Sequence, residues 1–164
     1  MPRIAHIYYA PVKSLALTPL ARTHVDKAGI PGDRAFVIVD AQGDAVTQRE
    51  CFPLVLVRAV YEPVDDHLTV TLPDGTVAAG VPEPGASAPI TGFWDQAVPA
   101  VEARGPWDDA LSAFAGRPLR LVRPAPGRAF DGYPLSICSL ESLDALAAAA
   151  GEERVDGRRF RQNI

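Results

Sequence analysis

The sequence predicts a mainly β protein of the α+β class, in which a β-barrel with one short helix precedes a partial β-α segment. Runs of β-favouring residues recur along most of the chain with turn signals between them, and helical patterns come late. The 16 prolines and 13 glycines among 164 residues argue against long helices. Many short strands joined by turns are typical of a closed or nearly closed barrel.

The first two strands are predicted over residues 4–9 and 15–25, where β-favouring side chains predominate. Pro11 stops the first strand, and Lys13 and Ser14 follow at its end. Side chains and free amides converge on ligands at such corners, but an exposed polar turn has the same composition. Both interpretations stay open here.

A turn built on two glycines and a proline leads Asp33 and Arg34 into the next apolar run, residues 35–39. Gly32 is expected to have a positive φ. Asp33 can accept hydrogen bonds from the amides of the turn. Arg34 either points into a pocket or pairs with Asp33, and the spacing slightly favours the ion pair.

Further strands are predicted from apolar or alternating runs. Asp74-Gly75 gives the plainest hairpin signal and joins residues 68–72 to 76–78. Residues 81–89 are rich in Pro and Gly and are expected to form an irregular surface loop. The other predicted strand segments are 45–49, 54–60, 90–94, 97–102 and 119–123.

Two helices are predicted from apolar spacing and end signals. The first covers residues 107–115, with acidic residues in its first turn and Gly116 at its end. The second covers residues 140–150, with Ser139 as N-cap and Gly151 as its stop.

A change of composition divides the chain into a barrel over residues 1–123, a connector rich in Pro and Gly over 124–132, and a segment over 133–164. That segment is predicted to begin with a short strand over residues 134–138. Its apolar helix face would be exposed unless the segment packs back on the barrel or pairs with a second chain, and a homodimer is the favoured expectation.

The final residues, 160–164, alternate apolar and polar side chains, which predicts an incipient strand with Arg161 and Asn163 on one face. A guanidinium fork beside an amide suits half of an anion or heterocycle site. The alternative is a solvated basic tail.

Composition and charge narrow the partners. The net charge of −4 and the pI near 5.3 argue against nucleic-acid binding, although a small anionic ligand stays possible. The first residues contain no apolar run of the signal-peptide kind, and no apolar run in the sequence is long enough to span a bilayer. Cys51 and Cys138 have no metal or disulfide spacing and are expected to be reduced thiols in a cytoplasmic protein.

Motifs for common catalytic chemistry are missing from the sequence. The three histidines fall on separate predicted elements, and there is no phosphate-binding loop, dinucleotide fingerprint or nucleophile elbow. No catalytic residue and no metal-ligand set is therefore assigned.

Six short motifs follow one another in order along the chain. They are Tyr9-Ala10-Pro11-Val12-Lys13-Ser14, Gly29 with Gly32-Asp33-Arg34, Asp40 and Gly43 before Thr47-Gln48-Arg49-Glu50, Trp94-Asp95, Gly116-Arg117-Pro118 with Arg120-Leu121-Val122, and Arg159-Phe160-Arg161 with Asn163. Together they resemble the N-terminal β-barrel of MOSC proteins, the molybdenum cofactor sulfurase C-terminal family, and the start of the MOSC domain. Members of that family include the mitochondrial amidoxime-reducing component and related bacterial reductases.

The resemblance implies a cradle for a pterin-bound molybdenum cofactor, within an oxidoreductase that acts on N-hydroxylated compounds. The implied small anionic partner is the pterin phosphate. The residues that match cofactor-binding positions of the family are Lys13, Ser14 and Arg34 from the barrel and Ser139, Arg161 and Asn163 from the MOSC side.

Departures from the family pattern limit this expectation. The cysteine that coordinates molybdenum lies downstream of the matching tract in the family, neither Cys51 nor Cys138 matches it, and Gln162 replaces the usual proline. The chain is therefore not expected to be catalytically complete alone. It would be a truncated form, a naturally short relative or part of a split protein. The alternative function is a non-catalytic module that recognises a phosphorylated small molecule or a partner protein.

Overall fold

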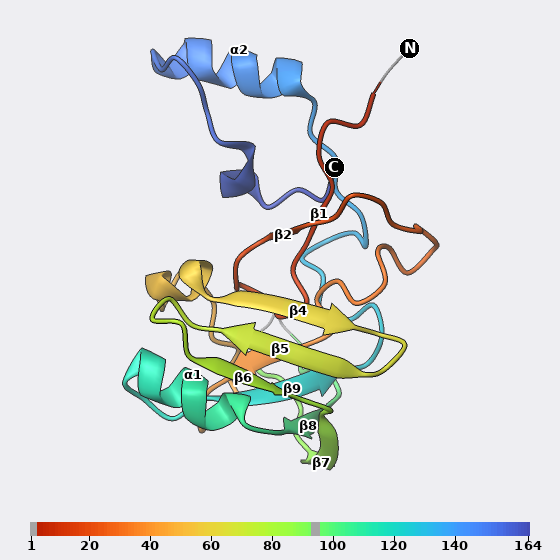
Figure 1. Cartoon of the computed structure of the whole chain (residues 1–164), viewed down its shortest axis with the longest axis vertical. Helices are drawn as coiled ribbons and strands as arrows, with labels where there is room; N and C mark the ends of the chain where they lie inside the picture. The colour runs from red at the N-terminus through yellow and green to blue at the C-terminus, as the bar shows by residue number, and fades with distance from the viewer. Residues whose placement is uncertain (1–2, 93–95) are drawn as a thin grey trace.

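The computed structural model describes residues 3–92 and 96–164 as a β domain with a helical arm, residues 133–164, at one end (Figure 1). Named strands pair antiparallel in three sheets, with the orders β1-β2, β3-β9-β8-β7 and β4-β5-β6. The strands are β1 (Tyr8–Tyr9), β2 (Thr18–Pro19), β3 (Val37–Val39), β4 (Arg58–Glu62), β5 (His67–Thr71), β6 (Val77–Gly80), β7 (Glu83–Ser87), β8 (Ala100–Arg104) and β9 (Arg120–Pro124). The mainly β fold class is confirmed.

Strand β3 is buried on both faces, which explains its unbroken apolar sequence. Ile38 packs into the main core, whereas Val37 and Val39 pack into a second cluster with Ile90 and Val122. The strand thus separates two apolar clusters of the domain.

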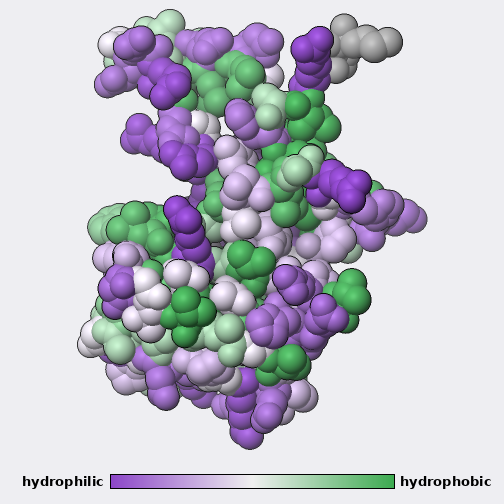
Figure 2. Space-filling model, in the orientation of Figure 1, coloured by the Kyte–Doolittle hydropathy of each residue, from purple (hydrophilic) through white to green (hydrophobic). Residues whose placement is uncertain are grey.

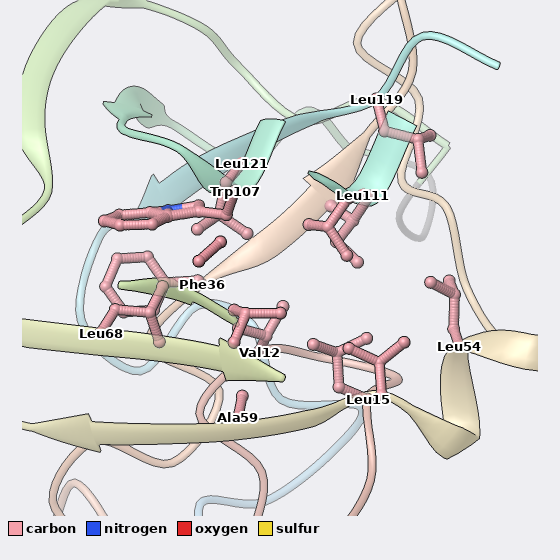
Figure 3. Close-up of a cluster of buried hydrophobic side chains, with 14 of the residues drawn as sticks. Val12, Leu15, Phe36, Leu54, Ala59, Leu68, Trp107, Leu111, Leu119 and Leu121 are labelled. Atoms are coloured by element: carbon pink, nitrogen blue, oxygen red, sulfur yellow. The ribbon is translucent and has the colours of Figure 1, made fainter. Parts of the chain in front are cut away.

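The main core lies between the four-stranded sheet, the three-stranded sheet and α1 (Figure 3). Its largest fully buried side chains include Phe36, Leu68, Trp107 and Leu111. Burying a side chain of this size stabilises the fold by about 1.5–3 kcal/mol. The barrel therefore has an apolar interior, and any polar site must lie at its ends.

The predicted hairpin at Asp74-Gly75 is confirmed as the connection between β5 and β6. Gly75 has φ 90°, a conformation that glycine adopts without steric cost. The Asp74 carboxylate accepts a hydrogen bond of 2.9 Å from the amide of Thr76 and holds the turn.

Helix α1 (Trp107–Ala115) has the predicted bounds, and Gly116 ends it in the left-handed conformation with φ 67°. Trp107 and Leu111 form its buried face, as expected from their spacing. The helix contacts β9 and β6 and closes one side of the core (Figure 1).

The prediction of one buried strand over residues 54–60 was half wrong. Phe52–Leu56 form a 3-10 helix, η1, and only the later part enters β4. Pro53 explains the difference, because proline cannot donate to a strand ladder but suits the first turn of a helix.

The prediction of an irregular loop over residues 81–89 was also wrong. Its central part forms β7, which lies at the edge of the four-stranded sheet and shifts register between Pro84 and Ser87. Edge strands and bulges are where a sheet accepts proline and glycine.

Other strands are shorter than predicted. Residues 4–9 and 15–25 contribute only the two-residue strands β1 and β2, and residues 45–49 form an isolated bridge followed by a turn. Of the segment 90–94, Ile90 pairs with Val98 in an isolated bridge, and residues 93–94 lie outside the described residues, as does the Trp94-Asp95 motif.

Helix α2 (Leu140–Ala150) of the arm has the predicted bounds. The Ser139 hydroxyl caps it by accepting from the amide of Ser142, and Gly151 ends it with φ 69°. Leu140 and Leu146 stay exposed on the helix. Association of two copies through this face stays a prediction.

Two strands predicted in the arm do not form. Residues 134–138 are irregular, and the chain end contains a 3-10 helix, η2 (Gly157–Phe160), followed by Arg161 at φ 56°. The two segments still meet through backbone hydrogen bonds. The backbone amide of Asn163 donates to the Ser136 carbonyl at 3.0 Å, and the backbone amide of Cys138 donates to the Ile164 carbonyl at 2.8 Å. The helical turn at η2 breaks the period-two alternation on which the strand prediction depended. Within the described residues, no helix has the length and apolar character needed to cross a bilayer.

Leu68→Ala tests the role of the core. We expect it to lower the free energy of unfolding by about 2–5 kcal/mol, because it leaves a cavity in a fully packed region. Urea denaturation measures the change. The exposed Val64 is the control, since Val64→Ala should change stability by less than about 0.5 kcal/mol. Equal effects for the two variants would contradict this assignment of the core.

Candidate functional site

A cavity of about 740 Å³ lies between the arm and the end of the barrel that the arm covers. Its walls come from the barrel loops around residues 13–14, 34 and 47–49, from the loop that leads into the arm, and from residues 159–163. Figure 2 shows hydrophilic side chains on both sides of the hollow between arm and barrel.

Lys13 and Ser14 reach the cavity through the turn that follows β1. The Lys13 amide donates to the Phe36 carbonyl at 2.8 Å, which ties the turn to the core. The Lys13 ammonium donates to the Ala129 carbonyl at 3.2 Å and to the Asp131 carboxylate at 2.8 Å. Burial lowers the pKa of Lys13, and the Asp131 carboxylate opposes this effect.

The sequence left open whether Arg34 pairs with Asp33 or points into a pocket, and the structure shows both. Arg34 forms an ion pair with Asp33 and also lines the cavity. The Arg34 amide donates to the Ala10 carbonyl at 2.8 Å, and the Asp33 carboxylate accepts from the Ala10 amide at 2.7 Å. The buried carboxylate thus fixes both the backbone and the guanidinium of the turn.

Asn163 joins the arm to this turn. Its side-chain amide donates to the Asp33 carboxylate at 3.0 Å and to the Tyr8 carbonyl at 3.1 Å. Its side-chain oxygen accepts at 3.1 Å from both the amide and the hydroxyl of Ser136. With 2% exposure, Asn163 is satisfied by three separate segments, which places the arm relative to the barrel.

Arg161 enters the cavity beside Arg34. Its guanidinium donates to the Leu15 carbonyl at 2.7 Å, and its own carbonyl accepts from the Arg34 guanidinium at 3.2 Å. Burial, together with the charge of Arg34, lowers the pKa of Arg161 to about 10. In the described part of the chain, no carboxylate lies within 4.0 Å of it as an ion pair.

Unusual backbone conformations gather at this site. Four non-glycine residues in the described ranges have positive φ, and three of them line the cavity: Ser14 at 74°, Arg34 at 52° and Arg161 at 56°. Each costs about 1–2 kcal/mol relative to the right-handed conformation. Strain of this kind is typical of functional sites, where surrounding contacts impose it.

The structure brings together five of the six site residues predicted from the resemblance: Lys13, Ser14, Arg34, Arg161 and Asn163. Ser139 is outside the cavity, where it caps α2. Their roles toward a ligand stay predictions.

Nothing in the sequence indicates that Asp131 pairs with Lys13 or that Ser136 binds the side chain of Asn163. Asp131 stands in the connector, where an Asp-Gly pair indicates a turn and gives no sign of a partner far away in the chain. Cys51 and Cys138 are free thiols that do not line the cavity, and the described residues contain no cluster of metal-ligating side chains.

Fold and sequence together define the class of this protein. Residues 1–115 match the family described as the MOSC N-terminal beta barrel domain, and the chain belongs to that family. Among solved structures, it is similar to the solution structure of a Bordetella bronchiseptica protein, with a TM-score of 0.54 and 16% identity over 77% of this chain and 95% of that chain. At this identity the likeness shows the fold alone. No curated protein matches the sequence.

Asn163→Ala tests the joint between arm and barrel. We expect tryptic cleavage within residues 154–161 to become about tenfold faster, since the variant leaves a buried carboxylate without one donor and frees the arm. Mass spectrometry of timed digests measures the rate. Gln162→Ala is the matched control, because within the described residues that side-chain amide donates to the nearby Phe160 carbonyl and to no group of the barrel. Unchanged cleavage of Asn163→Ala would show that other contacts hold the arm.

Proposed function

We infer that the cavity binds the pterin and phosphate of a molybdenum cofactor. The observation that carries this proposal is the convergence of Lys13, Arg34 and Arg161, together with the Ser14 hydroxyl, in one half-buried space of a chain with net charge −4. Membership of the MOSC family supports it, since that family is generally associated with this cofactor.

The chemistry of the donor set fits such a group. Guanidinium and ammonium groups suit a phosphate, and the Ser14 hydroxyl can donate to or accept from the edge of a heterocycle. Burial and the charge of Arg34 lower the pKa of Arg161, the charges of Asp33 and Asp131 oppose this effect, and Arg161 has no ion pair in the described residues; a bound anion would add to the opposing charge. A cavity of about 740 Å³ is in the size range of small-molecule sites.

Roles follow for the residues of this chain. Lys13, Arg34 and Arg161 would bind and orient the anionic end of the ligand, Asp33 would hold Arg34 in place, and Asn163 would hold Asp33. When bound, the cofactor supplies a redox-active molybdenum centre. Neither cysteine lines the cavity. The proposed role of the lining residues is therefore limited to binding the pterin and the phosphate, and it does not include coordination of the metal. Reduction of N-hydroxylated compounds is proposed only where a further thiolate completes the metal site.

Cofactor retention tests the proposal. The protein is produced in cells that make the molybdenum cofactor, purified, and assayed for bound pterin by fluorescence after oxidative release. We expect wild-type protein to retain pterin, and Arg34→Ala and Arg161→Ala each to lose at least about 80% of it, because each removes a charge-assisted contact worth about 1.5–3 kcal/mol.

Arg117→Ala is the matched control, because Arg117 is exposed after α1 and does not line the cavity. It should retain pterin as the wild type does. A wild-type protein that is stabilised by phosphate yet carries no pterin would overturn the assignment of the cofactor and favour a module for another phosphorylated small molecule.

A further inference from the structure

We propose that Arg49 and Arg159 form a second anion subsite at the rim of the cavity, outside the inner group Lys13, Arg34 and Arg161. It would receive a phosphate or carboxylate group of a substrate, or of the outward end of the bound ligand. The proposal deepens the proposed function and rests on it for the identity of the inner ligand.

The backbone of Arg49 is held by a turn in which Thr47 and Glu50 satisfy each other's polar groups. The Glu50 carboxylate accepts at 2.7 Å from both the amide and the hydroxyl of Thr47, and the Thr47 hydroxyl accepts from the Arg49 amide at 3.2 Å. The acidic neighbour is therefore engaged with Thr47. Within residues 3–92 and 96–164, the Arg49 guanidinium has no ion pair, and it is exposed at the cavity wall.

Arg159 reaches the cavity wall from η2. Its neighbour Arg158 is bound to Asp156, whose carboxylate accepts from the Arg158 guanidinium at 2.6 Å and from the Arg158 amide at 3.0 Å. Arg159 lines the cavity and has no such ion pair among the described residues. Two adjacent arginines thus have different surroundings.

Charge balance also points to a second anion. Within the described residues, five basic side chains line the cavity, Lys13, Arg34, Arg49, Arg159 and Arg161, against the one lining carboxylate of Asp131. Inside, Asp131 and Asp33 already offset two of the three cations, which leaves one positive charge there. One phosphate group carries about 1.5–2 negative charges near pH 7 and would more than offset that charge. Of the two rim charges, about 1–1.5 would then remain, and they would favour a ligand that carries a second negative group.

Side-chain NMR tests the subsite. Inorganic phosphate is titrated at pH 6 and low ionic strength into ¹⁵N-labelled protein that carries no pterin, and the arginine Nε–Hε signals are followed. We expect the signals of Arg49 and Arg159 to shift together and saturate with one dissociation constant. Arg49→Ala should weaken the phosphate affinity measured at Arg159 by up to about fivefold, the upper end for one exposed charge contact. Arg158→Ala should leave it unchanged.

A parallel titration with acetate distinguishes the two sources of the anion. Tighter binding of phosphate assigns a phosphate group, and tighter binding of acetate assigns a carboxylate. The proposal is overturned if Arg49 and Arg159 shift no more than Arg117, or if sodium chloride causes the same shifts. Failure of the proposed function would instead appear in the retention assay, as purified protein without pterin. The phosphate titration of Arg49 and Arg159 would still show whether the rim binds an anion.

Discussion

The cavity depends on buried contacts between the arm and the barrel, and central among them is the hydrogen bond from the side-chain amide of Asn163 to the carboxylate of Asp33. Asp33 is buried and carries a charge, so it needs every donor around it. One of its oxygens takes the Ala10 amide, and the other takes Arg34 and Asn163 together. The same amide that completes this shell also positions the arm. The orientation of Arg34 and the position of the arm are therefore coupled, because both depend on the Asp33 carboxylate.

Elements set by local chemistry could be predicted from the sequence. The bounds of α1 and α2, the cap at Ser139 and the hairpin at Asp74-Gly75 each follow from residues that lie side by side in the chain. The same holds for the corner of Lys13 and Ser14 and the turn before Arg34, where proline and glycine fix the backbone. Both turns that reach the cavity could therefore be located from the sequence.

Features that depend on distant partners could not be predicted in this way. Pro84 belongs to a strand only because β8 pairs with it at an edge, and Asp131 belongs to the site only because a loop more than a hundred residues downstream reaches Lys13. Arg161 and Asn163 were correctly placed together, but for the wrong reason. A left-handed residue after η2, and not a strand, directs both toward the barrel.

The positive φ angles of Ser14, Arg34 and Arg161 set stability against function at the same positions. Glycine would adopt each of these φ angles without steric strain, yet glycine would remove the hydroxyl or the guanidinium that lines the cavity. At Arg34 and Arg161, glycine would relieve the backbone strain but would also remove the contacts to Asp33 and to the Leu15 carbonyl, so the strained backbone and the side-chain contacts that offset it stand or fall together.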